Sequence, residues 1–394
     1  NLSCNRQPPK SSQPAAAFIA TSSLIMSEDI LEDDISRILY ESDSVSSGDS
    51  IVSRIIPYVV KCGTFAVGLL AIALGILYKK QDKLLYFPEI GGIPRRPGSN
   101  PRRYRSPSEH KLPFESHMIM TSDRVKIHSW LLLHPNSKKD QLPTIIFFHG
   151  NAGNIGLRLP NAYQMYHLLN ANILMVEYRG YGDSESKSEP SERGLKRDAE
   201  ASLRFLLTHP SVDPTRLFLF GRSLGGAVAF HLAAHAEKNG IPLAGLIVEN
   251  TFLSIGRMVD VLMPYLAPLK MLILRIGWDS GVIADGLRMP VLYLSGGADQ
   301  LVPPEQMMEL YRKSGKSSVC ARMYVVKDGT HNETWLQGGT AYWEKIKGFI
   351  NEAMSMSRNS SFYGSASISD SDLNKDGSHM DVGLGTEAEN SAKS

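Results

Sequence analysis

The sequence predicts an α/β fold: a mostly parallel central sheet with helices on both faces and a small cap, preceded by one transmembrane helix. Three observations support this prediction. Between residues 112 and 352, short apolar runs alternate with amphipathic stretches, which is typical of parallel strands joined by helices. One apolar run leads directly into a G-x-S-x-G turn, and a long uncharged run precedes the alternating region. The alternating region has the length of one domain of roughly 240 residues.

The expected strands begin with a hairpin that pairs residues 117–120 with 125–133. The runs that follow are short and continuously apolar, as strands covered on both faces are. These runs are 144–148, 173–177, 217–220, 243–248, 290–294 and 321–326. Helical patterns separate them at 157–170, 191–208, 224–238, 304–314 and 340–354. Functional residues of such sheets gather where the strands end, so the loops after the strands are the place to look for chemistry.

The charge and cysteine content exclude several classes of protein. The 394 residues carry 42 Lys and Arg against 40 Asp and Glu, a formal charge of +2. A nucleic-acid binder needs a concentrated basic face, so this balance argues against a nucleic-acid partner. The three cysteines, at positions 4, 62 and 320, form no CxxC pair. We therefore expect no structural zinc site, no disulfide framework and no metal.

Residues 64–78 form an uncharged run of fifteen residues, closed by Lys79, Lys80 and Lys83. At ~1.5 Å per residue this run covers about 22 Å, short of the ~30 Å hydrocarbon core of a bilayer. Including residues 55–60 makes it long enough. We expect a membrane-spanning helix over 55–78, with the lipid bilayer as a partner. A buried core helix is the alternative.

The flanks of this helix differ in charge. More Lys and Arg follow the helix than precede it, which favours a cytoplasmic location for the C-terminal side. The basic, Pro-rich stretch 79–111 is expected to be an extended linker. Asn332 begins a glycosylation sequon, which argues against the cytoplasm, but a glycan there would crowd a residue that we assign below to catalysis.

Both ends of the chain lack the composition of a folded core. Residues 1–54 are expected to be a disordered leader, with Met26 as the possible natural start, and residues 353–394 a disordered Ser-rich tail. Residues 372–377 match the first half of a calcium loop, but Gly383 stands where that loop needs a Glu. We therefore expect no calcium site.

The strongest motif is Gly221-Arg222-Ser223-Leu224-Gly225, which lies between an apolar run and a helix of small residues. A sharp strand-to-helix turn exposes the serine oxygen, and only glycine at the two flanking positions avoids a collision with neighbouring backbone. The motif therefore predicts Ser223 as a nucleophile on an elbow shaped by Gly221 and Gly225. A purely structural Gly-rich turn is the alternative.

A serine hydroxyl needs a base to activate it and an acid to orient that base. Asp299 and His331 each lie just past an apolar run, and both follow Ser223 in the order serine, acid, histidine. We expect Asp299 and His331 to complete a catalytic triad. Asp328 and Glu249 remain alternative acids.

The oxyanion formed in acyl transfer needs two N–H donors aimed at it. One is expected to be the backbone N–H of Leu224, next to the nucleophile. The other is expected to be the backbone N–H of Asn151, in the Gly-rich loop 149–154. This loop lacks the G-K-[ST] ending of a phosphate-binding loop.

Six segments together resemble one family: HGNAGNIG, EYRGYGDSES, FLFGRSLGGAVA, VENTF, SGGADQLVPP and DGTHNETW, in this order. They are similar to the membrane-anchored α/β-hydrolase domain-containing proteins, most of all the type counted thirteenth in animals and its yeast bud-emergence and plant wavy-growth relatives. The resemblance covers about residues 65–352. It implies a serine hydrolase of the esterase type with Ser223, Asp299 and His331 as its triad.

These observations lead to an expected function. The chain is expected to be a membrane-anchored serine hydrolase that cleaves acyl esters or thioesters through an acyl-enzyme, without a cofactor. A protein depalmitoylase and a lipid esterase both fit. Apolar side chains between residues 250 and 289 form either a lid over an acyl chain or a layer packed on the sheet. The alternative function is a catalytically silent, membrane-tethered interaction protein that keeps the hydrolase fold.

Overall fold

The computed structural model describes residues 51–89, 91–135 and 142–359. Residues 1–50 of the expected leader, Met26 among them, lie outside the described residues, as do residues 360–394 of the expected tail with the calcium-like segment. The chain divides into two compact units, residues 1–75 and residues 76–394.

The second unit contains one sheet of eight strands in the order β1-β2-β4-β3-β5-β6-β7-β8. The strands are β1 (Phe114–Met120), β2 (Lys126–Leu132), β3 (Thr144–Phe148), β4 (Asn172–Val176), β5 (Leu217–Arg222), β6 (Gly245–Glu249), β7 (Val291–Gly296) and β8 (Ala321–Val326). Strand β2 pairs antiparallel with β1 and β4, and the other neighbours pair in parallel. The prediction of a mostly parallel sheet is confirmed. β1 begins three residues before the expected hairpin strand, because its ladder with β2 extends to Phe114 opposite Leu132.

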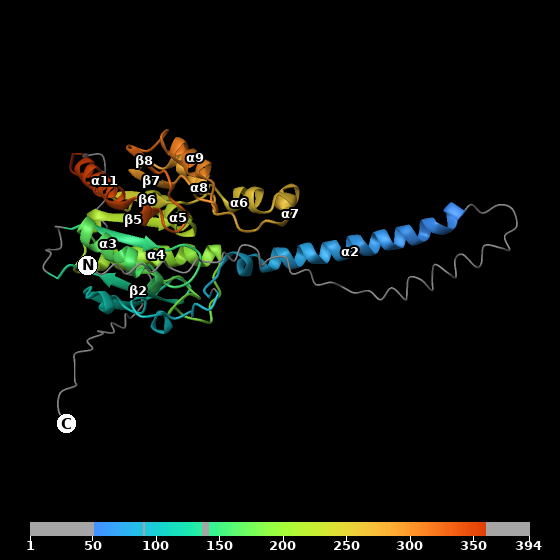
Figure 1. The fold of residues 1–394 in the computed structure, drawn as a ribbon, viewed down its shortest axis with the longest axis horizontal. Coiled ribbons are helices and arrows are strands. Elements are labelled where there is room, and N and C mark those ends of the chain that lie inside the picture. The colour runs from blue at the N-terminus through green and yellow to red at the C-terminus, as the bar shows by residue number, and fades with distance from the viewer. Residues whose placement is uncertain (1–50, 90, 136–141, 360–394) are drawn as a thin grey trace, which may run out of the picture. The chain divides into compact units, whose positions relative to one another are not determined.

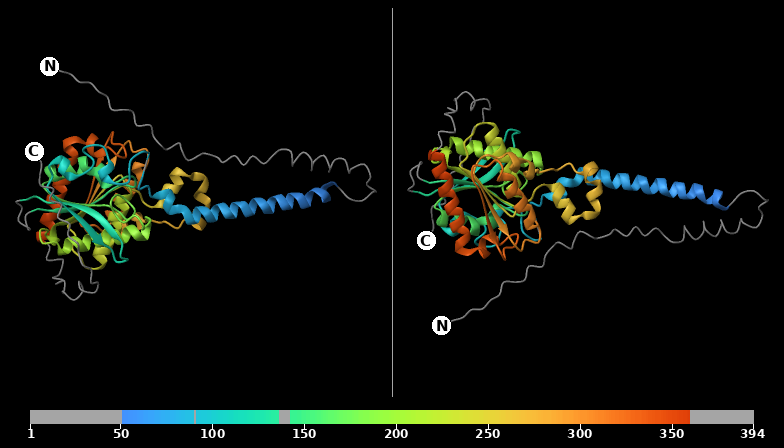
Figure 2. Two further views of the ribbon diagram at one scale, coloured as in Figure 1. Left: turned by 90° about the horizontal axis from the view of Figure 1, so that it is seen from below. Right: turned by 90° about the horizontal axis from the view of Figure 1, so that it is seen from above.

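Helices cover both faces of this sheet (Figure 1, Figure 2). Successive side chains of β3 show the two layers, since they point to opposite faces. Ile145 and Phe147 belong to the core under α3 (Leu159–Leu169) and α11 (Gly339–Asn359). Ile146 and Phe148 belong to the core on the other face. That second face is covered by α4 (Glu192–Thr208), α5 (Leu224–Lys238), α8 (Ser280–Gly286) and α9 (Pro304–Ser314).

The expected membrane helix is longer than the sequence predicts. Helix α2 runs over Ile51–Leu85, 35 residues with Pro57 inside it, so residues 51–54 of the expected leader are helical. Within the described part of the chain, Ser53–Leu85 is the one helix long and apolar enough to cross a membrane, with a mean hydropathy of 2.1 and none of that window buried. The boundary between the two units falls inside α2, so residues 76–85 belong to the second unit.

The stretch 79–111, expected to be an extended linker, is instead part of the second unit. Asn100 is 1% exposed, and its amide donates to Tyr104 O and Asn154 Oδ1 at 2.7 and 2.8 Å. The Arg95 guanidinium donates to Gly180 O at 2.8 Å. A Pro-rich composition by itself predicts an extended linker. Here, hydrogen bonds to residues far along the sequence, such as Asn154 and Gly180, hold the stretch against the rest of the second unit.

Candidate active site

Ser223 lies between the end of β5 and the start of α5, with φ 53° and ψ −121°. A non-glycine residue with positive φ is strained, and such strain is typical of nucleophile elbows. The flanking glycines show why the turn needs them. A Cβ at Gly225 would lie 2.1 Å from Phe148 O, and a Cβ at Gly221 would lie 2.2 Å from Gly225 O. The local backbone thus forms the elbow that the motif predicts.

The structure brings together the three residues that the sequence assigns to the triad. His331 Nε2 lies 3.0 Å from Ser223 Oγ, and His331 Nδ1 lies 2.7 Å from Asp299 Oδ2. Asp299 is 8% exposed, and its Oδ1 accepts hydrogen bonds from the backbone N–H groups of Leu301 and Val302 at 2.8 and 2.9 Å. The carboxylate is therefore fixed on one oxygen and presents the other to the imidazole.

The two alternative acids lie elsewhere. Glu249, at the end of β6, is fully buried, and its Oε2 accepts from Arg222 Nε at 2.8 Å. Its charge is therefore paired with the residue that precedes the nucleophile. Asp328 is exposed. Asp299 is the carboxylate that contacts His331.

The loop after β3 lies next to the nucleophile. A Cβ at Gly150 would lie 3.6 Å from Ser223 Cβ, so the backbone that leads into Asn151 passes close to Ser223. Leu224 is the first residue of α5. The structure therefore places both expected oxyanion donors on segments that adjoin Ser223.

The loop 149–154 is held by the end of helix α2 and by Phe87, a support that the sequence pattern did not reveal. The Asn151 amide donates to Leu85 O and accepts from the Tyr181 hydroxyl at 3.1 Å. The Tyr181 hydroxyl in turn accepts from Phe87 N at 3.1 Å. Gly153 N donates to Phe87 O at 3.1 Å. The side chain of Asn151 is thus fixed from both sides.

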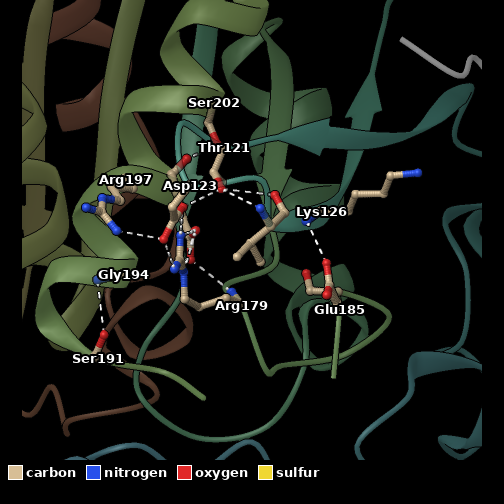
Figure 3. Close-up of polar contacts among 12 residues, drawn as sticks. Thr121, Asp123, Lys126, Arg179, Glu185, Ser191, Gly194, Arg197 and Ser202 are labelled. Carbon is tan, nitrogen blue, oxygen red and sulfur yellow. Dashed lines mark hydrogen bonds and ion pairs between the residues drawn. The ribbon is translucent and has the colours of Figure 1, made fainter. Parts of the chain in front are cut away.

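An ionic network holds Arg179, which lies in the loop after β4 two residues before Tyr181 (Figure 3). Arg179 bridges two carboxylates: its Nε donates to Asp198 Oδ1 at 2.9 Å and its Nη1 to Asp123 Oδ2 at 2.7 Å. Figure 3 shows Arg197 also converging on Asp123, at 2.7 Å. The network joins the β1–β2 turn, α4 and the loop that carries Tyr181.

The network shifts the pKa values of both carboxyl groups. Hydrogen bonds from Arg179 hold the pKa of Asp123 well below its usual range. Burial raises the pKa of Asp198 to about 6, although Arg179 acts in the opposite direction. Burial prevails at Asp198 because that side chain is fully enclosed in the fold.

Asn250 joins the two catalytic loops, a role that its sequence context alone did not predict. Its Oδ1 accepts from Gly296 N at 2.7 Å, at the start of the loop that carries Asp299. Its Nδ2 donates to His331 O at 3.0 Å. Asn250 has φ 47°, a conformation that asparagine tolerates better than most residues. The sequence offered one indication of this role: Asn250, in VENTF, directly follows an expected strand, where functional residues gather.

One group of acidic and histidine side chains in the described ranges could hold a metal: Glu115, His117 and His209. It lies on β1 and just past the end of α4 and includes no triad residue. Glu115 Oε2 lies 2.8 Å from His117 Nε2 and 3.2 Å from His209 Nε2. Ser211 N donates to His209 Nδ1 at 3.3 Å, so the neutral ring carries its proton on Nε2. This arrangement fits hydrogen bonding to the carboxylate better than metal ligation.

The apolar side chains between residues 250 and 289 differ in burial: some pack in the core and others are exposed to solvent. Buried in the core are Phe252, Leu253, Met258 and Trp278. Half-buried are Leu266 and Leu269. Exposed are Met263, Tyr265, Met271 and Leu272. Packing on the sheet therefore explains only part of the segment.

Comparisons with known proteins agree with this architecture. Residues 143–269 match a family model described as alpha/beta hydrolase fold. The chain is 36% identical to protein bem46 of Schizosaccharomyces pombe over 77% of its own length and 96% of that protein. It is 35% identical to the alpha/beta hydrolase domain-containing protein WAV2 of Arabidopsis thaliana, over 72% of this chain and 92% of WAV2. It is also 32% identical to an uncharacterized membrane protein of Saccharomyces cerevisiae, over 73% of this chain and 94% of that protein.

Among solved structures, the fold is similar to that of the Pyrococcus furiosus esterase Pf2001. The TM-score is 0.53 at 17% sequence identity, and the match covers 66% of this chain and 99% of the esterase. At this identity the likeness concerns the fold alone.

Proposed function

This chain belongs to the α/β-hydrolase family that includes bem46 and WAV2, and on this basis we propose that it is a serine hydrolase anchored to a membrane by α2. Its substrates are acyl esters or thioesters, and it acts through an acyl-enzyme. The observation that supports this proposal most directly is the continuous hydrogen-bonded line from Ser223 through His331 to Asp299. Membership of the family fixes the fold, and the site provides the chemistry.

The proposed reaction begins with the removal of a proton from Ser223 Oγ by His331 Nε2. The freed oxygen attacks the acyl carbonyl, and Asp299 stabilises the imidazolium through the hydrogen bond at Nδ1. The imidazolium then gives its proton to the leaving alcohol or thiol, which leaves an ester on Ser223. Water, activated by the same histidine, hydrolyses this ester and releases the acid.

The backbone N–H groups of Leu224 and Asn151 are the proposed donors to the oxyanion. The N-terminus of α5 adds a favourable dipole at the same place. A single donor in such a site is worth about 10²–10³ in kcat. The contacts that hold Asn151 to Leu85 and Tyr181 are therefore part of the proposed catalytic apparatus.

The substrate is proposed to be lipid-linked, either a palmitoylated protein or a lipid ester. A helix able to cross a membrane continues into the catalytic unit, and an anchor concentrates the enzyme where such substrates lie. A series of nitrophenyl esters of increasing chain length, compared with an acyl thioester, tests this assignment. A preference for acetyl over long acyl chains would contradict it.

We propose that the catalytic unit lies on the cytoplasmic side, since Lys and Arg are more frequent after the helix than before it. Asn332 is exposed and would be an acceptor on the other side. A shift in mass on treatment with an endoglycosidase, absent in Asn332→Gln, would contradict the cytoplasmic location.

Labelling with a fluorophosphonate probe tests the nucleophile. The native chain should be labelled and Ser223→Ala should not. Ser355→Ala is the matched control, because Ser355 lies exposed on α11 and its hydroxyl donates to the nearby Glu352 O at 2.7 Å, within the same helix. Absence of labelling in folded native protein would favour the catalytically silent alternative.

A further inference from the structure

The segment that leaves β6 carries an exposed apolar surface. It comprises α6 (Ile255–Leu262), a 3₁₀ helix η7 (Pro264–Leu269) and α7 (Lys270–Ile273). We call its exposed large apolar residues the cap patch: Val261, Leu262, Met263, Tyr265, Met271 and Leu272. Tyr265, Met271 and Leu272 are 74%, 87% and 80% exposed. Scattered apolar residues are normal on a surface, whereas six large exposed ones within the twelve positions 261–272, on elements that pack against one another, indicate a site of contact.

The cap patch is anchored next to the end of α2. Gln81, in the part of α2 that belongs to the second unit, donates to Ile273 O and accepts from Arg275 N at 2.9 Å. Arg275 also pairs with Asp82. Figures 1 and 2 show α6 and α7 standing out from the sheet domain beside this last part of α2. The end of α7 is therefore held at the level of Gln81.

That level corresponds to the surface of a bilayer. Tyr78, Lys79 and Lys80 close the apolar run of α2 and are exposed. Tyrosine and lysine at the end of a spanning helix lie among the lipid head groups. Ile273 is bonded to the next residue, Gln81, and Met271 and Leu272 precede it in α7. These two side chains therefore lie next to the end of the apolar run, where an interfacial helix buries apolar side chains about 5–10 Å deep.

We propose that the cap patch inserts into the membrane leaflet in which α2 ends, so that the catalytic unit contacts lipid at two places. The occupant of the patch is the bilayer, because the end of α7 is bonded to Gln81, which directly follows the lysines that close the apolar run of α2. Arg257 and Lys270 flank the patch and both pair with Asp260, so the three side chains together carry one net positive charge, with Arg257 63% exposed. Such flanks favour anionic head groups.

The two contacts would orient the active site. The chain that leads into α6 starts beside Ser223, where Thr251 Oγ1 donates to Ser223 O at 2.7 Å. On the other side, Leu85 at the end of α2 accepts from Asn151. A single helix lets a domain rotate about its axis, whereas a second contact fixes the face that meets the lipid. Membrane insertion of the cap patch does not depend on the hydrolytic activity.

The test uses the full chain with Cys4→Ser and Cys62→Ser, since Cys320 is buried. Leu272→Cys carries an environment-sensitive fluorophore, and the protein is reconstituted into phosphatidylcholine–phosphatidylserine vesicles that contain a lipid with a nitroxide on its acyl chain. The expected result is a blue-shifted emission that the nitroxide quenches. The matched control is Val319→Cys, which is 65% exposed in the turn before β8; its label should stay unquenched. Equal quenching at 272 and 319 would overturn the proposal.

A second variant separates the cap patch from the anchor. Met271→Asp with Leu272→Asp should abolish quenching of a fluorophore at Tyr265→Cys, while α2 keeps the protein in the vesicle. A melting curve in detergent with the same midpoint as the native chain shows that this variant is folded. Retained quenching would overturn the proposal. Disulfide cross-linking between copies through Leu272→Cys, without quenching, would show that a second copy covers the patch and would equally overturn it.

Discussion

At the scale of single residues, two neighbouring strand ends carry left-handed backbone next to the reacting groups. Ser223 follows β5 with φ 53°, and Asn250 follows β6 with φ 47°. The first turn presents Ser223, the proposed nucleophile, to His331. The second directs an amide between the loops of Asp299 and His331. Two sharp turns on adjacent strands therefore set the distances within the triad.

Asn250→Gly should slow acyl transfer without unfolding the protein. Glycine accepts the positive φ, so the change removes only the bonds to Gly296, Thr330, His331 and Thr334. A misplacement of about 1 Å costs up to about 10²-fold in rate, and we expect kcat to fall by about 10- to 100-fold. Initial rates on a nitrophenyl ester measure it. Asn332→Gly, next to His331 but exposed, is the control; an equal loss in both variants would show that Asn250 has no special role.

Gly225→Ala should destroy the elbow. The new Cβ would lie 2.1 Å from Phe148 O, and backbone cannot move aside without shifting β3. We expect loss of fluorophosphonate labelling together with a lower melting temperature. Gly348→Ala is the matched control, since nothing lies within 4 Å of its Cβ; in helix α11 it should stabilise the fold by about 0.5–1 kcal/mol. Normal labelling of Gly225→Ala would contradict the steric argument.

The sequence was informative where chemistry depends on a local motif. Gly221, Ser223 and Gly225 lie within five positions, and their spacing alone predicts a turn that the structure contains. Asp299 and His331 could be predicted because each follows an expected strand and both come after Ser223 in the order serine, acid, histidine. Asn250 and Tyr181 were missed because their bonds reach residues 81 and 30 positions away, and a pattern along the chain does not record such partners.

At the scale of elements, the Arg179 network connects the hairpin, α4 and the loop of Tyr181. The folded-state pKa of Asp123 lies below its ordinary value, so its contribution to stability is present above about pH 4 and is lost as the pH falls through the lower range. The pKa of Asp198 is raised to about 6, so its contribution has the opposite sign and is lost as the pH rises through 6. The two carboxyl groups thus respond to pH in opposite directions.

Asp123→Asn should therefore destabilise the protein most near neutral pH. It removes an ionised acceptor from Arg179, and we expect a loss of about 1–3 kcal/mol in the free energy of unfolding. The difference in free energy of unfolding between this variant and the native chain should become smaller below about pH 4. Unfolding in detergent at a series of pH values measures it. Asp285→Asn, which removes a surface pair with Lys316, should lower the free energy of unfolding much less. If the loss in Asp123→Asn did not change with pH, the pKa of Asp123 would not be lowered by folding.

The strands and the main covering helices followed from apolar periodicity, because burial on both faces leaves a visible pattern. The segment 79–111 did not. Its prolines and charges suggested a linker, whereas single polar side chains such as Asn100 and Arg95 hold it on the domain. Helix α2 also extends to Leu85, past the lysines that were expected to end the membrane span. Contacts with distant residues determine both features.

At the scale of the whole molecule, the last turns of α2 belong functionally to the catalytic unit. A chain that begins at Ile76 keeps the hydrogen bonds of Gln81, Leu85 and Phe87, whereas one that begins at Pro88 has none of them. We expect the shorter chain to melt lower, by about 2–4 °C for each kcal/mol of stability that these hydrogen bonds contribute. It should also react more slowly with the fluorophosphonate probe.

Melting curves and labelling rates of the two chains provide the comparison. Gln81→Ala in the longer chain is the control, because it removes the hydrogen bonds to the cap segment and leaves the bond between Asn151 and Leu85. It should lower the melting temperature less than the truncation does and should leave the labelling rate nearer to that of the longer chain. Identical behaviour of both truncated chains would show that the end of α2 contributes nothing to the site.

The order of the parts along the chain has a consequence for biosynthesis. Helix α2 leaves the ribosome before the nucleophile, and the histidine follows 108 positions after the nucleophile. Proteins emerge from their N-terminus at about 5–20 residues per second, so a nascent chain carries its tether before it can assemble a base for Ser223. In the proposed function, therefore, α2 can enter the membrane while the chain still lacks His331, and hydrolysis begins only after β8, the strand that precedes His331, has joined the sheet.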